Sequence, residues 1–294
     1  MILITDGGST KCDWILLDSE GDVVLKTRTL GLNPAVIPEA ELYDRISGNS
    51  DLQSVCDTIE TLDFYGAGCG TKTPVALLTS ILEKIFKNAN VRVKEDTVAA
   101  VYAATTKPGI VCILGTGSNS CYFDGKDIHA SVVSLGYTLM DEASGNYFGK
   151  RLLRDYFYKK MPSVLALEFE KRFDLEADTI KLNLYKKPNP NMYLASFAAF
   201  IFSSEKNRSF QAEEINKYFY HLIREGIQKF IEYRILCFKE SQQVPIHFIG
   251  SIAHFSEAII RDCLKPYNLE LGNVIRRPID GLIAYYKNNR PQNE

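Results

Sequence analysis

Short apolar runs separated by tight turns open the chain. Residues 2–5, 13–17 and 23–29 are rich in β-branched and other apolar residues, with Asp, Gly and Ser between them. Runs of this length, bounded by turn residues, are typical of strands joined in hairpins. The pattern therefore predicts an antiparallel meander of three strands.

Helical spacing follows this meander. Apolar residues recur every three or four positions in residues 39–46, 51–58 and 75–86, and short β-rich runs stand at 62–65 and 91–93. Such spacing gives each helix one apolar face, and alternation of helices with strands indicates an α/β fold. We therefore predict helices that cover a sheet.

The same order of elements begins again after residue 106. Residues 106–109, Thr-Lys-Pro-Gly, are typical of a linker. They precede an apolar run, a glycine-containing turn at 115–118 and a second β-rich run. The repeat predicts a duplicated fold with two related domains, residues 1–106 and 107–294, each beginning with a glycine-containing hairpin.

The second half of the chain is mainly helical in pattern. A long stretch at 213–238 carries aromatic residues at three- and four-residue spacing, which is typical of a buried helix face. Strands are predicted at 245–249 and, more weakly, at 269–271, and a last helix begins at about residue 279, after Pro278.

Composition narrows the class of protein. The chain has 294 residues, of which 46% are hydrophobic and 24% charged, a mix that suits two globular domains. Its net charge of -2 gives no electrostatic reason to expect a nucleic-acid or acidic-membrane partner. The seven cysteines are scattered and form no Cys-x-x-Cys pair, which argues against a disulfide framework or a zinc ribbon. No signal peptide or membrane-length apolar segment is recognisable, so we expect a soluble, cytoplasmic protein.

Two glycine-containing turns have the chemistry of a phosphate site. Glycine lets backbone N–H groups approach an anion, hydroxyl groups can donate to phosphate oxygens, and a lysine adds positive charge. Asp6, at a strand end, could hold Mg²⁺ through water. Each turn alone is also an ordinary hairpin turn, but two facing each other across a cleft could clamp a triphosphate. The candidate residues are Gly7, Gly8, Ser9, Thr10 and Lys11 in the first turn and Gly115, Thr116, Gly117 and Ser118 in the second.

Two further positions have both a structural and a functional interpretation. Asp96 precedes a predicted helix, where it could be an N-cap or a base at the end of a strand. Gly250 and Ser251 join a strand to a helix, which is a common turn and also a surface that a flat ligand or an anion can approach closely.

The order of these motifs resembles one family. DGGSTK, an Asp that opens a helix, LGTGSN, a DE-S-G segment and IGSIA follow one another as in the N-acetylglucosamine kinase branch of the BadF/BadG/BcrA/BcrD ATPases. These belong to the sugar kinase/heat-shock protein/actin superfamily. The resemblance implies two actin-like, ribonuclease H-like domains with mixed five-stranded sheets, flanking helices and a cleft between them. It also implies that the last helix, about 279–288, packs back on the N-terminal domain.

The resemblance also implies roles for individual residues. Asp96 would be the catalytic base, the two hairpin turns would bind the phosphates of ATP with Mg²⁺ at Asp6, and Gly250 and Ser251 would contact adenosine. Sugar hydroxyls would be bound by Asn33, Asn119 and Asp141. The expected partner is a small-molecule sugar, and a homodimer is left open. One departure concerns the sugar: Leu135 stands where the family commonly has a tryptophan, and the single Trp of this chain is Trp14.

Two other functions remain open at this point. The same ATPase group contains activators of partner reductases that hold an iron–sulfur cluster with cysteines, although this chain has no closely spaced cysteine pair. A nucleotide or sugar sensor could keep the fold without turnover. The intact Asp6, Asp96 and GTGS motif favour a kinase.

Overall fold

The computed structural model describes residues 1–8, 10–203 and 212–288, so Ser9, predicted to bind phosphate, lies outside the described residues. The chain forms two compact units. Unit 1 combines residues 1–106 with the segment from Arg277 onwards, and unit 2 contains residues 107–276. Each unit is built on one five-stranded sheet.

Unit 1 contains the predicted three-stranded meander followed by helices and parallel strands. Its elements are β1 (Ile2–Gly7), β2 (Lys11–Leu17), β3 (Val23–Leu30), α1 (Glu39–Ser47), α2 (Ser50–Val55), a 3-10 turn (Cys56–Thr58), β4 (Thr61–Gly66), α3 (Lys72–Ile85), β5 (Asn90–Glu95), α4 (Asp96–Ala104) and α12 (Pro278–Asn288). The strand order is β3-β2-β1-β4-β5, with β1, β2 and β3 antiparallel and β1, β4 and β5 parallel.

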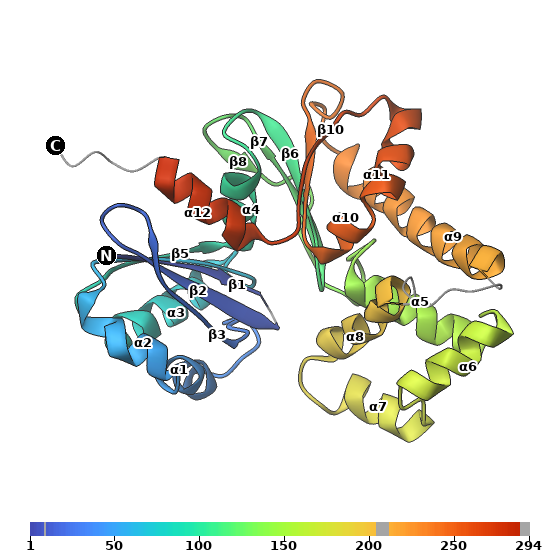
Figure 1. Ribbon diagram of the computed structural model, residues 1–294, viewed down its shortest axis with the longest axis horizontal. Helices are drawn as coiled ribbons and strands as arrows, with labels where there is room; N and C mark the ends of the chain where they lie inside the picture. The colour runs from blue at the N-terminus through green and yellow to red at the C-terminus, as the bar shows by residue number, and fades with distance from the viewer. Residues whose placement is uncertain (9, 204–211, 289–294) are drawn as a thin grey trace. The chain divides into compact units, whose positions relative to one another are not determined.

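Alternation along the strands of unit 1 supplies a core on each face of the sheet. One face, with Leu3 and Trp14, packs against α1, α2 and α3, whereas the other, with Ile4 and Ile15, packs against α4 and α12 (Figure 1). Gly281 lets α12 approach α4, because a Cβ there would lie 2.6 Å from the Cβ of Ala103. The first turn of α12 therefore lies against the last turn of α4.

Unit 2 repeats the arrangement. Its elements are β6 (Gly109–Leu114), β7 (Ser118–Phe123), β8 (Ile128–His129), α5 (Gly145–Phe157), α6 (Ser163–Arg172), α7 (Ala177–Tyr185), α8 (Pro190–Ser203), α9 (Ala212–Phe230), a π-helical turn (Ile231–Ile235), β9 (Ile246–Ile249), α10 (Ser251–Phe255), α11 (Glu257–Leu264), a 3-10 turn (Lys265–Tyr267) and β10 (Leu271–Ile275). The strand order β8-β7-β6-β9-β10 has the same directions as the sheet of unit 1. The predicted duplication is confirmed.

Unit 2 differs from the sequence expectation in detail. The weak strand expected at 269–271 is β10, which begins at Leu271 and continues to Ile275, and the two-residue strand β8 was not expected. The long aromatic helix becomes α9, which ends at Phe230 and continues as a π-helical turn. Its apolar stripe lies in the core of unit 2, as predicted. Within the described residues, no helix combines the length and apolar character that crossing a bilayer requires.

Candidate active site

The carboxyl ends of the parallel strands of unit 1 bring its candidate residues together. Asp6 stands at the end of β1, and Gly7 is paired with Gly66 at the end of β4, which is paired in turn with Glu95 at the end of β5. Asp96 follows directly as the first residue of α4. Ligands of open α/β sheets bind outside this edge, so the expected base and the expected metal ligand both lie where a substrate would arrive.

Asp96 is a partly buried acid that stays protonated to near neutral pH. Burial, reinforced by the negative charges of Glu95 and Asp6, raises its pKa to about 7 from 3.8, against the backbone N–H groups of Thr97 and of Asp96 itself, which lower it. The N-cap of α4 is Glu95, in extended backbone, rather than Asp96. A carboxylate with a pKa near the working pH suits a general base better than a cap.

The pKa of Asp6 is raised as well. Burial and the charge of Asp13 raise its pKa to about 6, while Lys11 and Arg277 act to lower it. A bound cation would remove this penalty. The described residues hold no group of three acidic, His or Cys side chains that could bind a metal by themselves. One carboxylate is nevertheless enough for Mg²⁺, which keeps several waters and takes substrate phosphate oxygens.

Asn33 lies beside the same edge through the Gly66–Gly70 segment. Gly68 has a φ of +81°, and a Cβ there would lie 2.0 Å from Oδ1 of Asn33. That oxygen accepts a hydrogen bond from the backbone N–H of Ala35 at 3.0 Å. Gly70 similarly lies against the Glu95 carboxylate, since a Cβ there would be 3.0 Å from Oε1. The segment therefore approaches Asn33 and Glu95, and Glu95 is a candidate that the sequence analysis missed although it precedes Asp96.

The first hairpin turn is closed by a backbone hydrogen bond from Gly8 N to Lys11 O at 2.9 Å. Gly7 packs against Phe64, whose ring a Cβ at Gly7 would meet at 2.6 Å. The carbonyl of Thr10 accepts the N–H of Gly31 at 3.0 Å, and the Lys11 ammonium reaches Asp13 at 2.6 Å. These contacts fix the turn at the end of β1 and β2.

The second hairpin turn, Gly115–Ser118, is held by the start of α5. The N–H groups of Gly145 and Asn146 donate to the carbonyls of Gly115 and Thr116 at 2.8 and 3.0 Å. Since the C=O and N–H of a planar trans peptide point in opposite directions, the N–H groups that follow these carbonyls point away from α5. The N–H groups of Thr116 and Gly117 therefore face the side of the turn opposite to α5. The Ser118 hydroxyl is buried and has no hydrogen-bond partner within the described part of the chain.

Asp141 holds this turn through its carboxylate. It is 9% exposed, and its two carboxylate oxygens accept the N–H of Ser118 at 3.2 Å and the Nδ2–H of Asn146 at 2.8 Å. Its φ of 72° is strained for a residue with a side chain. Asn119 is engaged as well, because its Oδ1 accepts the N–H of Ser120 at 2.9 Å and a guanidinium N–H of the buried Arg234. Both predicted sugar ligands are thus held by neighbours within unit 2.

A pocket of about 360 Å³ opens beside the second turn. Small side chains on one face of α8 form one wall, and two aromatic rings, Phe202 and Phe255, stack on each other with centroids 5.4 Å apart. Arg276 lies over the Phe255 ring at 5.1 Å. The lining residues are Gly115, Thr116, Gly145, Ala195, Ala198, Ala199, Phe202, Ser251, Ile252 and Phe255. An apolar pocket of this size, next to a glycine-containing turn, can hold a small molecule.

Gly250 has a structural reason to be glycine. Its φ is +116°, and a Cβ there would lie 2.2 Å from the carbonyl oxygen of Leu114. Gly250 therefore lies against the end of β6, the strand that leads into the Gly115–Ser118 turn. A substitution such as Gly250→Val would displace this backbone, so it cannot separate a loss of nucleotide contact from a loss of folding.

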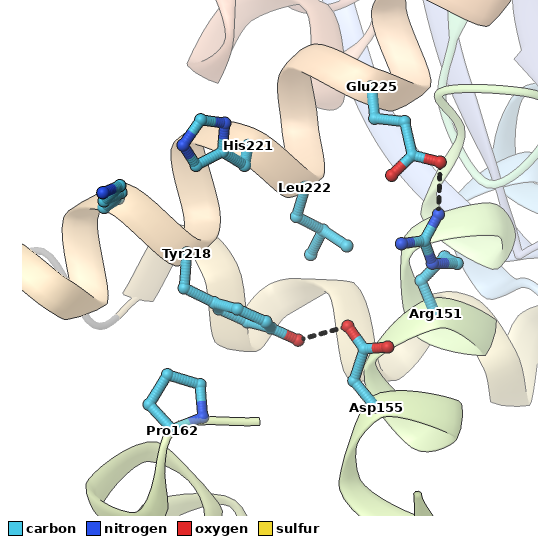
Figure 2. Close-up of a pocket in the computed structure, with 8 residues that line it drawn as sticks. Arg151, Asp155, Pro162, Tyr218, His221, Leu222 and Glu225 are labelled. Carbon is cyan, nitrogen blue, oxygen red and sulfur yellow. Dashed lines mark hydrogen bonds and ion pairs between the residues drawn. The ribbon is translucent and has the colours of Figure 1, made fainter. Parts of the chain in front are cut away.

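A second pocket of unit 2, also about 360 Å³, lies between α5 and α9. Figure 2 shows Tyr218 pointing at Asp155 and Arg151 pointing at Glu225, with hydrogen-bond distances of 2.8 Å in both pairs. Because these four polar groups bond to one another, little of their hydrogen-bonding capacity is left for a ligand. We do not assign it to the site.

The two units define the class of protein. Two mixed five-stranded sheets of the same strand order, each opening with a glycine-containing hairpin and flanked by helices, form the two-domain actin-like ATPase fold.

Known proteins then define the family. The chain is 34% identical to a candidate N-acetylglucosamine kinase from Porphyromonas gingivalis, covering 98% of this chain and 99% of that one with a TM-score of 0.87. A candidate N-acetylglucosamine kinase from Chromobacterium violaceum (14% identity, 97% and 98% coverage, TM-score 0.69) has the same fold. So does a ROK family glucokinase from Streptomyces griseus in complex with glucose and AMPPNP (13% identity, 96% and 97% coverage, TM-score 0.58). No family model matches the chain. The chain belongs to the sugar kinases of the actin-like ATPase superfamily.

Proposed function

We propose that this protein transfers a phosphoryl group from ATP to a hydroxyl of N-acetylglucosamine or a related amino sugar, within the BadF/BadG/BcrA/BcrD branch of the superfamily. The observation that carries the proposal is Asp96, a partly buried carboxylate with a pKa of about 7 at the strand edge next to Asp6. The similarity to the candidate N-acetylglucosamine kinase from P. gingivalis supports the choice of sugar.

Asp96 would act on the acceptor hydroxyl. In the deprotonated state its carboxylate accepts a hydrogen bond from the hydroxyl, orients the oxygen toward the phosphoryl group and takes the proton as the new P–O bond forms. Asn33 and Glu95, which both lie against the Gly66–Gly70 segment, are suited to bind neighbouring sugar hydroxyls. We retain Asn119 and Asp141 as proposed sugar ligands, although each is also hydrogen-bonded within unit 2.

The nucleotide would use both hairpin turns. The pocket beside α8 and α10 suits the adenine ring and ribose, with Ser251 and Gly250 at the start of α10, and the Gly115–Ser118 turn suits the phosphates. Mg²⁺ held by Asp6 through water would neutralise charge on the transferred phosphoryl group. In this proposal unit 1 is the sugar and phosphate domain and unit 2 the nucleotide domain. The reaction would take place in the cytoplasm, where ATP is available.

The direct test is ADP release with a panel of sugars at matched concentration. The panel contains N-acetylglucosamine, glucosamine, N-acetylmuramic acid, N-acetylmannosamine and glucose, with a no-sugar control. We expect N-acetylglucosamine or a close amino-sugar relative to give the highest kcat/KM. Tight ATP binding with no stimulation by any sugar would replace the kinase with a nucleotide sensor, and iron in anaerobically purified protein would replace it with a reductase activator.

The pH dependence of kcat/KM provides a second check. Because Asp96 must be deprotonated to accept the proton and its pKa is about 7, activity at low sugar concentration should fall about tenfold per pH unit below that pKa and level off above it. The measurement is kcat/KM for the sugar at saturating ATP from about pH 5 to about pH 9. A flat profile across this range would contradict a base with this pKa.

A substitution at Gly115 can test nucleotide binding beside this turn without disturbing the fold. A Cβ added at Gly115 meets no atom closer than 4.0 Å in the protein, so Gly115→Ala should fold normally. The methyl group would occupy space beside the pocket, and overpacking of a binding site by one methyl typically costs about 1–3 kcal/mol. We expect KM for ATP to rise about tenfold while KM for the sugar and the melting temperature stay unchanged. Equal rises in both KM values would contradict a nucleotide contact at this turn.

A further inference from the structure

A buried carboxylate on β2 gathers three cations beside the first hairpin turn. Asp13 is 4% exposed. Its Oδ1 accepts a hydrogen bond from Arg28 Nε at 2.6 Å, and its Oδ2 accepts one from Lys11 Nζ at 2.6 Å and one from an Arg277 guanidinium N–H at 3.3 Å. We call Lys11, Arg28, Arg277 and Asp13 the Asp13 cluster.

The sheet register places the Asp13 cluster next to Asp6. Asp6 on β1 is directly opposite Asp13 on β2, and Asp13 is directly opposite Arg28 on β3. Residues directly opposite in antiparallel strands point to the same face, so these three side chains form one row across the sheet. Lys11 is two residues before Asp13 and shares its face. Arg277 immediately precedes α12, which covers that face.

The charges around Asp13 are unequal. Three cations meet the Asp13 carboxylate, and Asp6 in the same row adds a second carboxylate, so one positive charge remains in excess when Asp6 is ionised. The side chains of Lys11, Arg28 and Arg277 are 44%, 54% and 42% exposed, whereas Asp13 lies beneath them. An anion arriving from solvent therefore meets guanidinium and ammonium groups before it meets the carboxylate. Arginine guanidinium groups held in place by another acid are well suited to phosphate oxygens.

We propose that Arg28 and Arg277, together with Lys11, bind the terminal phosphates of the nucleotide and that Asp13 is the positioning residue that holds the three cations at this edge. This inference rests on the proposed function, because it names further residues that bind the phosphate groups of the ATP that the proposed kinase uses. It extends the phosphate site from the hairpin turn to β3 and to the segment before α12. The cluster also supplies positive charge next to Asp6.

The first test measures anion binding without turnover. Inorganic tripolyphosphate is titrated into the full chain by calorimetry at low and at high salt, in the absence of sugar. We expect Arg28→Gln and Arg277→Gln each to weaken tripolyphosphate binding by about three- to tenfold, because each removes one charge-assisted contact. Lys26→Gln is the matched control. Lys26 is exposed on the same face of β3, two residues before Arg28, so its loss removes the same charge but should leave the affinity unchanged.

Asp13→Asn separates positioning from net charge. The substitution makes the cluster more positive by one unit, so a purely electrostatic effect would tighten tripolyphosphate binding. If Asp13 holds the cations in place, binding should weaken instead, by about three- to tenfold as for the arginine variants. The buried Trp14, adjacent to Asp13, reports by fluorescence whether the variant is folded. Should this variant fail to fold, the two exposed arginines still decide the question.

Steady-state kinetics complete the test. Arg28→Gln and Arg277→Gln should raise KM for ATP or lower kcat, and leave KM for the sugar unchanged. Unaltered tripolyphosphate affinity in both arginine variants, or tighter binding in Asp13→Asn, would overturn the proposal even if the protein is a sugar kinase. Conversely, if the arginine variants lose tripolyphosphate affinity but the unaltered protein phosphorylates no sugar, the anion site is supported and only the proposed function is wrong.

Discussion

Replacing Asp96 with Asn is expected to lower kcat by about 10²–10⁴-fold, the usual contribution of a general base. The amide keeps the shape of the carboxylate but cannot accept the sugar proton. It also leaves α4 intact, because the residue is the first of the helix and Glu95 is its N-cap. The measurement is single-turnover phosphorylation together with the Kd for sugar and for ATP, which should stay within a few-fold of the original values.

The control for this experiment is Asp51→Asn. Asp51 is likewise an acidic residue in the first turn of a short helix of unit 1, but it lies on α2 and is hydrogen-bonded to Thr27. If the loss in Asp96→Asn arose from removing a negative charge at a helix start, both variants would be impaired by the same small factor. Wild-type turnover in Asp96→Asn would end the catalytic assignment.

The substitution Asp96→Asn should also stabilise unit 1 above neutral pH. The pKa of Asp96 is about 7 in the folded chain and 3.8 in the unfolded chain. Between these two values the folded state keeps the proton that the unfolded state has already released. Stability therefore falls as pH rises from about 4 to about 7 and stays low above that. We expect Asp96→Asn to raise the free energy of unfolding at pH 8 by about 2–4 kcal/mol and to have little effect near pH 4.

Trp14 makes this measurement specific to unit 1, because it is the single Trp of the chain and is fully buried in that unit. Asp13→Asn provides a control of opposite sign. Burial raises the pKa of Asp13, but the hydrogen bonds and charges of Lys11 and Arg28 together outweigh it, so the net pKa is lowered. The stability that Asp13 contributes is present above the ordinary aspartate pKa and is lost as pH falls below it. An Asp96→Asn variant that is destabilised at pH 8 would contradict the raised pKa.

Sequence patterns predicted the elements whose signals are local. The hairpin strands β1, β2, β6 and β7 were found because apolar runs alternate with turn residues, and α4 was found because Asp96 opens an apolar helix. Strand β10 was placed too early, since its middle residues, Gly272 and Asn273, are poor strand formers. A two-residue strand such as β8 gives no periodic signal at all.

The site was predicted less completely than the fold. The glycine turns and Asp96 have local signatures, but the Asp13 cluster depends on strand register and on Arg277, which is 264 residues from Asp13. No short pattern contains that information. The wall formed by Ala195 and Ala198 is similarly invisible, because small residues on a helix indicate close packing as readily as a pocket. Gly250 was interpreted as a ligand contact, whereas its backbone has its own reason to be glycine in the approach to Leu114.

The return of α12 to unit 1 has a consequence for biosynthesis. Ile279 and Leu282 complete the core beside Ile4, Ile15 and Tyr65, and the hydroxyl of Tyr286 contacts that of Tyr65 at 2.7 Å. When residues 1–106 have left the ribosome, α4 covers part of this face of the sheet, but the part that α12 covers is still exposed. That part stays exposed until the whole of unit 2 has been translated and residues 278–288 emerge. Unit 2 is contiguous in sequence and meets no such delay. A nascent chain therefore has to protect an apolar sheet face for most of its synthesis, which makes that face the natural contact for a chaperone and a chain that stops before α12 a substrate for proteolysis.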